Sequence, residues 1–189
     1  MIRRIQFGLL ILIAALVTGI VITWRLSEAP TAATASVAAK ASVDAPPGEV
    51  GSVVPEFSVT DIHGRTMTSE DLRGKVLLVD YWSTWCKPCE KEMPGYQRLQ
   101  EKYRDREFIV IGIAFDGNMK MGDETVEHYA TRLKIEYPLV LDLPQLQKNF
   151  GSIQGLPTTF LIDRNRKIRF KVVGFEYAEK IEAALLGLL

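Results

Sequence analysis

The sequence has little of the chemistry-bearing residues and no excess of charge. It holds two cysteines and two histidines among 189 residues, and its 23 Lys and Arg balance its 23 Asp and Glu. Nucleic-acid binding needs a clustered basic face, which this balance does not indicate. Two cysteines are too few for a structural disulfide framework, and His63 and His128 lack zinc-finger spacing and are expected on the solvated surface. We therefore expect no nucleic-acid partner, no metal and no cofactor.

The longest apolar run lies near the start of the sequence. Residues 5–24 are about as many as a helix needs to cross a bilayer, and more than the apolar core of a signal peptide. The run therefore favours an uncleaved anchor, and Ala33-Thr34-Ala35 keeps a cleaved signal peptide as the alternative. Arg3 and Arg4 precede the run, which places the N-terminus in the cytoplasm. We expect residues 1–26 to be a single-pass transmembrane signal-anchor, with the rest in the periplasm or another extracytoplasmic space.

Composition divides the remaining chain into a linker and a domain. Residues 27–48 are rich in Ala, Ser, Thr and Pro and have too few large apolar side chains to bury a core. We expect a flexible linker there. Residues 49–189 alternate apolar runs with helical patterns and are predicted to form one α/β domain.

Periodicity and turn residues predict the elements of this domain in order. They are a hairpin of Phe57–Thr60 and Thr66–Thr68 with Gly64 in its turn, a helical turn at Ser69–Leu72 ended by Gly74, a strand at Val76–Trp82, a helix at Cys86–Arg104, a strand at Phe108–Phe115, a helix at Glu124–Lys134, a strand at Tyr137–Leu141, a helix at Pro144–Phe150, strands at Thr158–Ile162 and Ile168–Val173, and a helix at Ala178–Leu189.

Both cysteines lie where the central strand gives way to a helix. Cys86 is predicted at the helix N-terminus, where unpaired N–H groups and the helix dipole stabilise an anion. We expect it to be an exposed thiolate of low pKa, with Cys89 turned inward. Pro88 suits the first helical turn, because its missing N–H has no partner there. Two cysteines separated by two residues form a disulfide that opens and closes, so the pair is predicted to be redox-active.

Two separated motifs in this order resemble one known family. W-C-K-P-C followed by K-E-M-P, and then G-L-P-T-T-F-L-I-D at Gly155–Asp163, are similar to the membrane-anchored TlpA/ResA/CcmG group of thiol-disulfide oxidoreductases. The resemblance covers roughly residues 50–189. It implies a thioredoxin-like α/β fold with an N-terminal β-hairpin, a central strand-helix insertion and one preceding transmembrane helix.

The resemblance also implies the reaction. Cys86 is the nucleophile that attacks a partner disulfide, and Cys89 resolves the mixed disulfide. Resolution needs a base, and two acids are candidates. Asp80 ends the hydrophobic strand at the position of the buried aspartate of thioredoxin, where many relatives have asparagine. Glu92 lies three residues after Cys89 and matches the glutamate of the group, unless it is an ordinary solvated carboxylate.

Five residues are expected to form the surface that meets a client: Trp85, Lys87, Pro88, Leu156 and Pro157. Pro157 corresponds to the cis-proline that faces the cysteines in thioredoxin folds, so the Leu156 backbone is expected to pair with an extended client chain. Trp85 is expected to be a contact surface and Trp82 to pack inside. Lys87 adds a positive charge that is expected to lower the pKa of the thiol beside it.

The favoured function is a reductase of protein disulfides. The resemblance implies an integral-membrane electron donor of the CcdA/DsbD type, and apocytochrome c or a copper-binding oxidase subunit as client. The alternatives are a disulfide-forming oxidant, disfavoured because no histidine lies between the cysteines, and a copper(I) metallochaperone that uses the same thiols. A peroxidase is disfavoured because the Pro and Thr of the peroxiredoxin pattern are missing.

Overall fold

The computed structural model describes residues 45–115 and 125–189. The predicted transmembrane segment at residues 1–26, most of the predicted linker and residues 116–124 lie outside the described residues. Within the two described ranges, no helix has the length and apolar character needed to cross a membrane.

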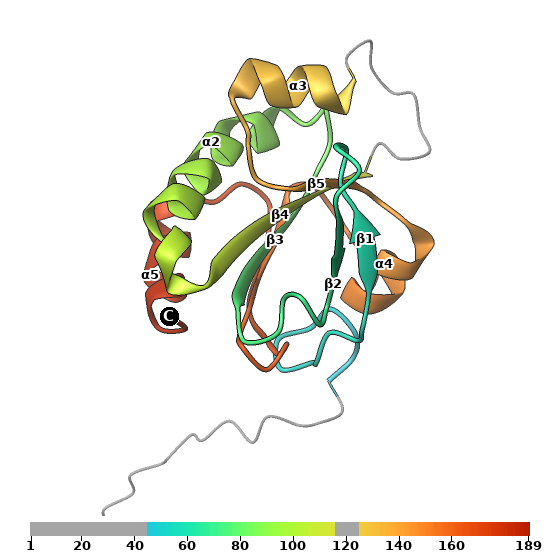
Figure 1. The fold of residues 1–189 in the computed structure, drawn as a ribbon, viewed down its shortest axis with the longest axis vertical. Coiled ribbons are helices and arrows are strands. Elements are labelled where there is room, and N and C mark those ends of the chain that lie inside the picture. The colour runs from blue at the N-terminus through green and yellow to red at the C-terminus, as the bar shows by residue number, and fades with distance from the viewer. Residues whose placement is uncertain (1–44, 116–124) are drawn as a thin grey trace, which may run out of the picture. The chain divides into compact units, whose positions relative to one another are not determined.

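A five-stranded mixed sheet forms the centre of the domain, in the order β5-β4-β3-β6-β7 (Figure 1). The parallel strands are β3 (Val76–Trp82), β4 (Phe108–Ala114) and β5 (Leu139–Leu141), and β6 (Thr158–Ile162) and β7 (Ile168–Val173) complete the sheet as antiparallel strands. A separate antiparallel hairpin joins β1 (Ser58–Thr60) and β2 (Thr66–Thr68). Along the chain, the strands follow one another in the predicted order.

The helices cover the two faces of the sheet. Figure 1 shows α2 (Lys87–Lys102) and α5 (Ala178–Leu186) along one face, and α4 (Pro144–Phe150) with the hairpin along the other. Helix α3 (Val126–Leu133) contributes to the same core as α2, and the short 3₁₀ helix η1 (Arg104–Arg106) follows α2. Between α3 and β6, the chain forms β5 and α4, which is the predicted strand-helix insertion.

Strand β3 is buried on both faces of the sheet. Its side chains alternate between the two faces and so belong to two separate core clusters. Val76, Leu78 and Trp82 join the cluster under α2, whereas Leu77 and Tyr81 join the cluster under α4. Successive side chains of a strand point to opposite faces, so the even-numbered Asp80 belongs to the α2 face. Asp80 therefore places a carboxyl group in the apolar core under α2, on the same face of the sheet as the two cysteines.

Some predicted boundaries differ from the structure. Ser69–Leu72 forms a run of turns instead of a helix, although Gly74 ends it with a positive φ of 77°. Strand β5 starts at Leu139 because Pro138 before it has no N–H to give to a ladder. Helix α5 ends at Leu186, three residues before the predicted end, and Gly187 caps it.

The packed part of the chain begins slightly before the predicted domain start at Glu49. A side chain at Gly48 would overlap the backbone of Phe150, and one at Gly151 would overlap the Pro47 carbonyl. Further on, the Gly51 N–H donates to the Ile168 carbonyl at 2.8 Å. The segment before β1 is thus held against α4 and the edge of β7.

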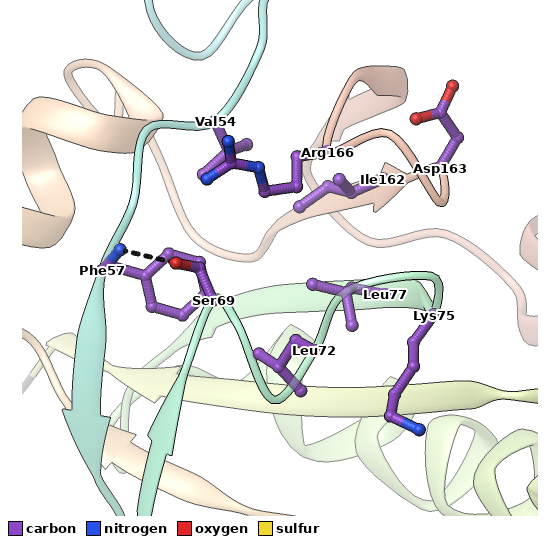
Figure 2. Close-up of a pocket in the computed structure, with 9 residues that line it drawn as sticks. All are labelled: Val54, Phe57, Ser69, Leu72, Lys75, Leu77, Ile162, Asp163 and Arg166. Carbon is purple, nitrogen blue, oxygen red and sulfur yellow. Dashed lines mark hydrogen bonds between the residues drawn. The ribbon is translucent and has the colours of Figure 1, made fainter.

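A small cavity lies at the end of the sheet away from the cysteines. Figure 2 shows its lining around the start of β3 and the end of β6, with the Phe57 N–H donating to Ser69 Oγ at 3.3 Å. Its walls are mainly apolar: Val54, Phe57, Ser69, Leu72, Lys75, Leu77, Ile162, Asp163 and Arg166. The reactive groups of the protein are at the opposite end of β3.

Candidate active site

The two cysteines form a disulfide at the start of α2, and the helix explains the position of each. Cys86 is the N-cap residue, with extended backbone angles, and its Sγ accepts from the Cys89 N–H at 3.3 Å. The Cα atoms of the two residues are 5.3 Å apart. Pro88 lies in the first turn, as predicted. A sulfur that accepts from the N-terminal amides of a helix is placed where negative charge is stabilised.

The exposure predicted for Cys86 is wrong for this disulfide form. Cys86 is 4% exposed and Cys89 is fully buried. Both belong to the apolar cluster that includes Trp82 and Met93, because the first turn of α2 packs directly on the sheet. A partner must therefore come into close contact with the surface around Cys86 to reach its sulfur.

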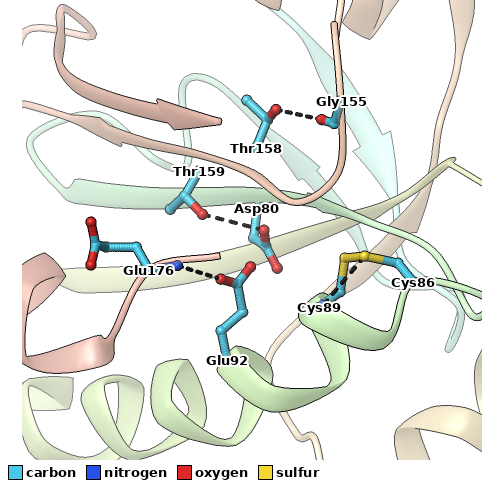
Figure 3. The surroundings of a disulfide bond; sticks show 8 residues. All are labelled: Asp80, Cys86, Cys89, Glu92, Gly155, Thr158, Thr159 and Glu176. Carbon is cyan, nitrogen blue, oxygen red and sulfur yellow. Dashed lines mark hydrogen bonds between the residues drawn. A yellow bond between two sulfur atoms is a disulfide. The ribbon is translucent and has the colours of Figure 1, made fainter. Parts of the chain in front are cut away.

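Two buried acids lie behind the disulfide (Figure 3). Asp80 is fully buried on β3 and Glu92 is 2% exposed on α2, one turn after Cys89. The solvated position considered for Glu92 is excluded. Thr159 Oγ1 donates to Asp80 Oδ1 at 3.4 Å, and the Glu176 N–H donates to Glu92 Oε2 at 3.3 Å. Each acid has a second oxygen, Asp80 Oδ2 and Glu92 Oε1, that is buried without a hydrogen-bond partner among the described residues.

Burial raises the pKa of both acids. It raises the pKa of Asp80 to about 7, and the hydrogen bond from Thr159 opposes the shift. It raises the pKa of Glu92 to about 9, and the nearby charge of Asp80 adds to the effect. Two carboxyl groups this close titrate as a pair. Near neutral pH the pair holds at least one proton, and the acid that carries it can donate to the other. The singly deprotonated pair is a base of the strength that proton transfer at neutral pH requires.

Sequence reasoning missed the polar groups around this pair. The Tyr96 hydroxyl is 3.0 Å from Thr159 Oγ1, and its pKa is raised by burial and by the two acids. Tyr96 follows Glu92 by four residues on α2, a spacing that signals a shared helix face. Thr159 lies directly opposite Asp80 in the β3–β6 register, which no local pattern indicates. The contact of Glu176 with Glu92 is made by the Glu176 backbone N–H, so no pattern of side chains in the sequence predicts it.

The predicted client surface is brought together around the disulfide. Trp85 is 46% exposed, and Trp82 is fully buried. The Leu156–Pro157 peptide bond is cis, and Leu156 packs against the cluster that holds both cysteines. Pro157 precedes β6, whose first residue pairs with Tyr81 near the end of β3.

A carboxylate beside Lys87 offsets part of the positive charge that Lys87 brings to the sulfur. Its Nζ is 3.4 Å from Glu90 Oε2, and Glu90 also forms an ion pair with Arg132 of α3 at 2.7 Å. The Lys87 side chain is 83% exposed, so solvent screens it as well. The lowering of the thiol pKa expected from Lys87 is therefore reduced by the carboxylate beside it.

Comparison with known proteins shows the family of the chain. The model of the AhpC/TSA family matches residues 50–171. The chain belongs to the AhpC/TSA family. Thiol-disulfide oxidoreductase ResA of Geobacillus kaustophilus is 36% identical to this AhpC/TSA chain over 136 residues, 72% of this chain and 76% of that protein. ResA of Bacillus anthracis is 33% identical over 137 residues, 72% of this chain and 77% of that protein.

Solved structures show the same fold. A putative thiol:disulfide interchange protein DsbE from Chlorobium tepidum superposes with a TM-score of 0.64 at 30% identity, covering 74% of this chain and 97% of that one. StoA from Bacillus subtilis superposes with a TM-score of 0.60 at 25% identity, covering 70% and 98%. The thioredoxin-like fold and the resemblance to the ResA group are thus confirmed, and this AhpC/TSA chain is a thiol-disulfide oxidoreductase.

Proposed function

We propose that the protein is a membrane-tethered reductase of protein disulfides that works outside the cytoplasm. The observation that carries the direction of the reaction is the buried Asp80–Glu92 pair behind Cys89. Strong dithiol oxidants owe their potential to a stabilised thiolate in the reduced form. Here an acid pair that carries negative charge above neutral pH opposes a second buried anion, and Glu90 offsets the charge of Lys87. Both effects disfavour the thiolate and so favour a reducing potential.

The reaction starts from the dithiol. The Cys86 thiolate attacks one sulfur of a client disulfide, forms a mixed disulfide and releases the other client sulfur as a thiolate, which takes up a proton. Cys89 then passes its proton to the acid pair and attacks the Cys86 sulfur. The Cys86–Cys89 disulfide forms and the second client thiolate leaves. Two electrons have moved to the client, and a donor dithiol must return two electrons to the protein.

The partners follow from the resemblance to the ResA group. We propose an integral-membrane electron donor of the CcdA/DsbD type, and apocytochrome c or a copper-binding oxidase subunit as client. The apolar residues 5–24 are the proposed tether, in the cytoplasmic membrane with the domain outside. If the tether is right, the protein resists alkaline extraction from membranes and is released by detergent. Recovery in the soluble extracytoplasmic fraction would show a cleaved signal peptide instead.

The reduction potential of the Cys86–Cys89 pair tests the direction of electron flow. We expect a value near or below roughly −250 mV for the full-length protein equilibrated against a thiol buffer, which allows electrons to pass to client disulfides. A value near about −120 mV would identify a disulfide-forming oxidant and overturn the proposal. Stoichiometric binding of copper(I) by the dithiol, without reduction of any disulfide, would favour the metallochaperone.

A further inference from the structure

Three exposed apolar side chains follow one another where β7 leads into α5. Val173, Phe175 and Tyr177 are 51%, 37% and 67% exposed. They are spaced two residues apart, and the Phe175 and Tyr177 rings meet nearly edge to face with centroids 5.0 Å apart. Aromatic rings that are ordered against each other yet open to solvent are typical of surfaces that bind a partner.

Hydrogen bonds hold this segment against the redox site at two points. The Gly174 N–H donates to the Pro157 carbonyl at 2.8 Å, and the Glu176 N–H donates to Glu92 Oε2 at 3.3 Å. The two rings belong to Phe175 and Tyr177, each of which directly follows one of these two donors in the sequence. They are therefore carried on a segment fixed both to Pro157 and to the acid pair, and Figure 3 shows the contact of Glu176 with Glu92.

The neighbouring backbone also lacks a partner. No hydrogen bond joins the Leu156 N–H or carbonyl to another residue in the described parts of the chain. An extended peptide can use such a free donor and acceptor in the manner of strand addition. Trp85 adds a further exposed ring beside Cys86.

The proposed reaction indicates that a client protein covers this surface. A client sulfur must reach Cys86, which is 4% exposed, so in every turnover the client must contact the surface around Cys86, and Leu156 packs against the cluster that holds this cysteine. We propose that Phe175 and Tyr177 form a docking surface for an extended client segment that carries a large apolar side chain beside its cysteine. The inference rests on the proposed function and adds the chemical class of its client.

The test compares two synthetic peptides whose single cysteine is disulfide-linked to nitrothiobenzoate, one with Phe and one with Ser on both sides of the cysteine. The reduced full-length protein attacks the peptide sulfur and releases the coloured thiolate, and the symmetrical disulfide of nitrothiobenzoate serves as the small substrate. We expect wild type to favour the Phe peptide over the Ser peptide. In the Phe175→Ser/Tyr177→Ser variant, the ratio of the Phe-peptide rate to the small-substrate rate should fall roughly tenfold, which corresponds to losing about 1.4 kcal/mol of binding.

Leu186→Ser is the matched control, because Leu186 is an apolar side chain 53% exposed on α5 and outside the site. Its rate ratio should stay at the wild-type value. An unchanged ratio in the double variant, or an equal fall with both substrates, would overturn the docking surface. The docking surface would also be overturned if wild type formed a concentration-dependent dimer that the double variant did not form. The two rings would then belong to a contact between copies of the protein.

A second arm separates this inference from the proposed function. Binding of the same peptides with an S-methylated cysteine, measured by fluorescence anisotropy, needs no redox reaction. Tighter binding of the Phe peptide that is lost in the double variant supports the surface even if no disulfide is reduced, in which case the proposed function alone fails. Equal binding of both peptides to wild type overturns the surface.

Discussion

Glu92 shows how burial turns a common helix residue into a reactive one. Its spacing from Cys89 is equally compatible with a solvated carboxylate and with a proton acceptor. In the folded domain it faces Asp80 and accepts from the Glu176 N–H, with 2% of its surface exposed. Because burial and the charge of Asp80 both raise the energy of ionised Glu92, one proton stays with the pair near neutral pH. The chemistry therefore belongs to two residues together.

Removing the acids should slow the step in which Cys89 attacks. We expect Asp80→Asn and Glu92→Gln each to slow resolution of the mixed disulfide at neutral pH, and the double variant to slow it on the order of 100-fold. The mixed disulfide, trapped by acid quenching and followed by mass spectrometry, reports this step. Glu127→Gln, at an exposed position of α3, is the control. Resolution at the wild-type rate in the double variant would show that neither acid takes the proton.

The same acids should make stability depend on pH. An acid whose pKa is higher in the folded protein than in the unfolded chain stabilises the fold while it is protonated. That contribution is present below the unfolded pKa near 4 and is lost as pH rises through the folded pKa, here about 7 for Asp80. We expect the free energy of unfolding to fall by about 2 kcal/mol between mildly acidic and mildly alkaline pH. Asp80→Asn should make this dependence shallower in urea unfolding of the oxidised protein, with the contribution of Glu92 remaining, and a slope as steep as that of wild type would contradict the assignment.

At the scale of elements, α2 holds the site because it packs closely on both β3 and α5. Its inward face carries Cys89, Glu92 and Tyr96, so any shift of the helix moves the acids relative to the sulfur. Gly95 lies on this helix where α5 approaches, and a Cβ built there would be 2.7 Å from the Cβ of Ala178. The absence of a side chain at Gly95 therefore sets the distance between the two helices.

Gly95→Ala tests this close approach. Alanine favours helix by about 1 kcal/mol over glycine, but the overlap with Ala178 forces the helices apart, so we expect a net destabilisation of about 1–2 kcal/mol. Urea unfolding measures it. Gly187→Ala is the matched control, since a Cβ there would meet only the Ala184 carbonyl, at 3.6 Å. Equal stability of the Gly95→Ala variant and wild type would mean that the α2–α5 contact yields without strain.

At the scale of the whole molecule, the segment before β1 closes the face of the sheet opposite the cysteines. Pro47 and Gly48 pack against Phe150 and Gly151 at the end of α4, and Lys171 of β7 pairs with Glu49 at 2.7 Å. The folded unit therefore includes at least two residues that composition assigned to the linker. Where the domain ends and the linker begins is a matter of contacts more than of composition.

Shortened versions of the protein should reveal this boundary. A version lacking residues 1–48 should unfold at a lower temperature than one lacking residues 1–44, by an amount that corresponds to about 1 kcal/mol. The lost contacts are those of Pro47 and Gly48 with the end of α4. Thermal unfolding of the oxidised forms measures the difference. Identical melting temperatures would place the boundary at Glu49, as composition predicts.

The sequence by itself determined the elements and the reactive pair, because both depend on residues close together in the chain. Continuous apolar runs, helical spacing, proline and glycine positions and the spacing of Cys86 and Cys89 are local, and they predicted every strand and every long helix of the described domain to within a few residues. The resemblance of two motifs extended this to the cis peptide at Pro157.

Only the tertiary structure decided the environment of those groups. The register that sets Thr159 opposite Asp80, the depth of Glu92 and the return of residues 174–177 to the cis-proline turn join positions up to 84 residues apart. Such contacts leave no period in the sequence, and burial, which sets the pKa of the acids and hides Cys86, is a property of packing from several elements at once. The sequence therefore predicts the thiol-disulfide chemistry of Cys86 and Cys89. The packing of α2, β6 and the β7–α5 segment determines which groups can accept the proton and which side chains face a client.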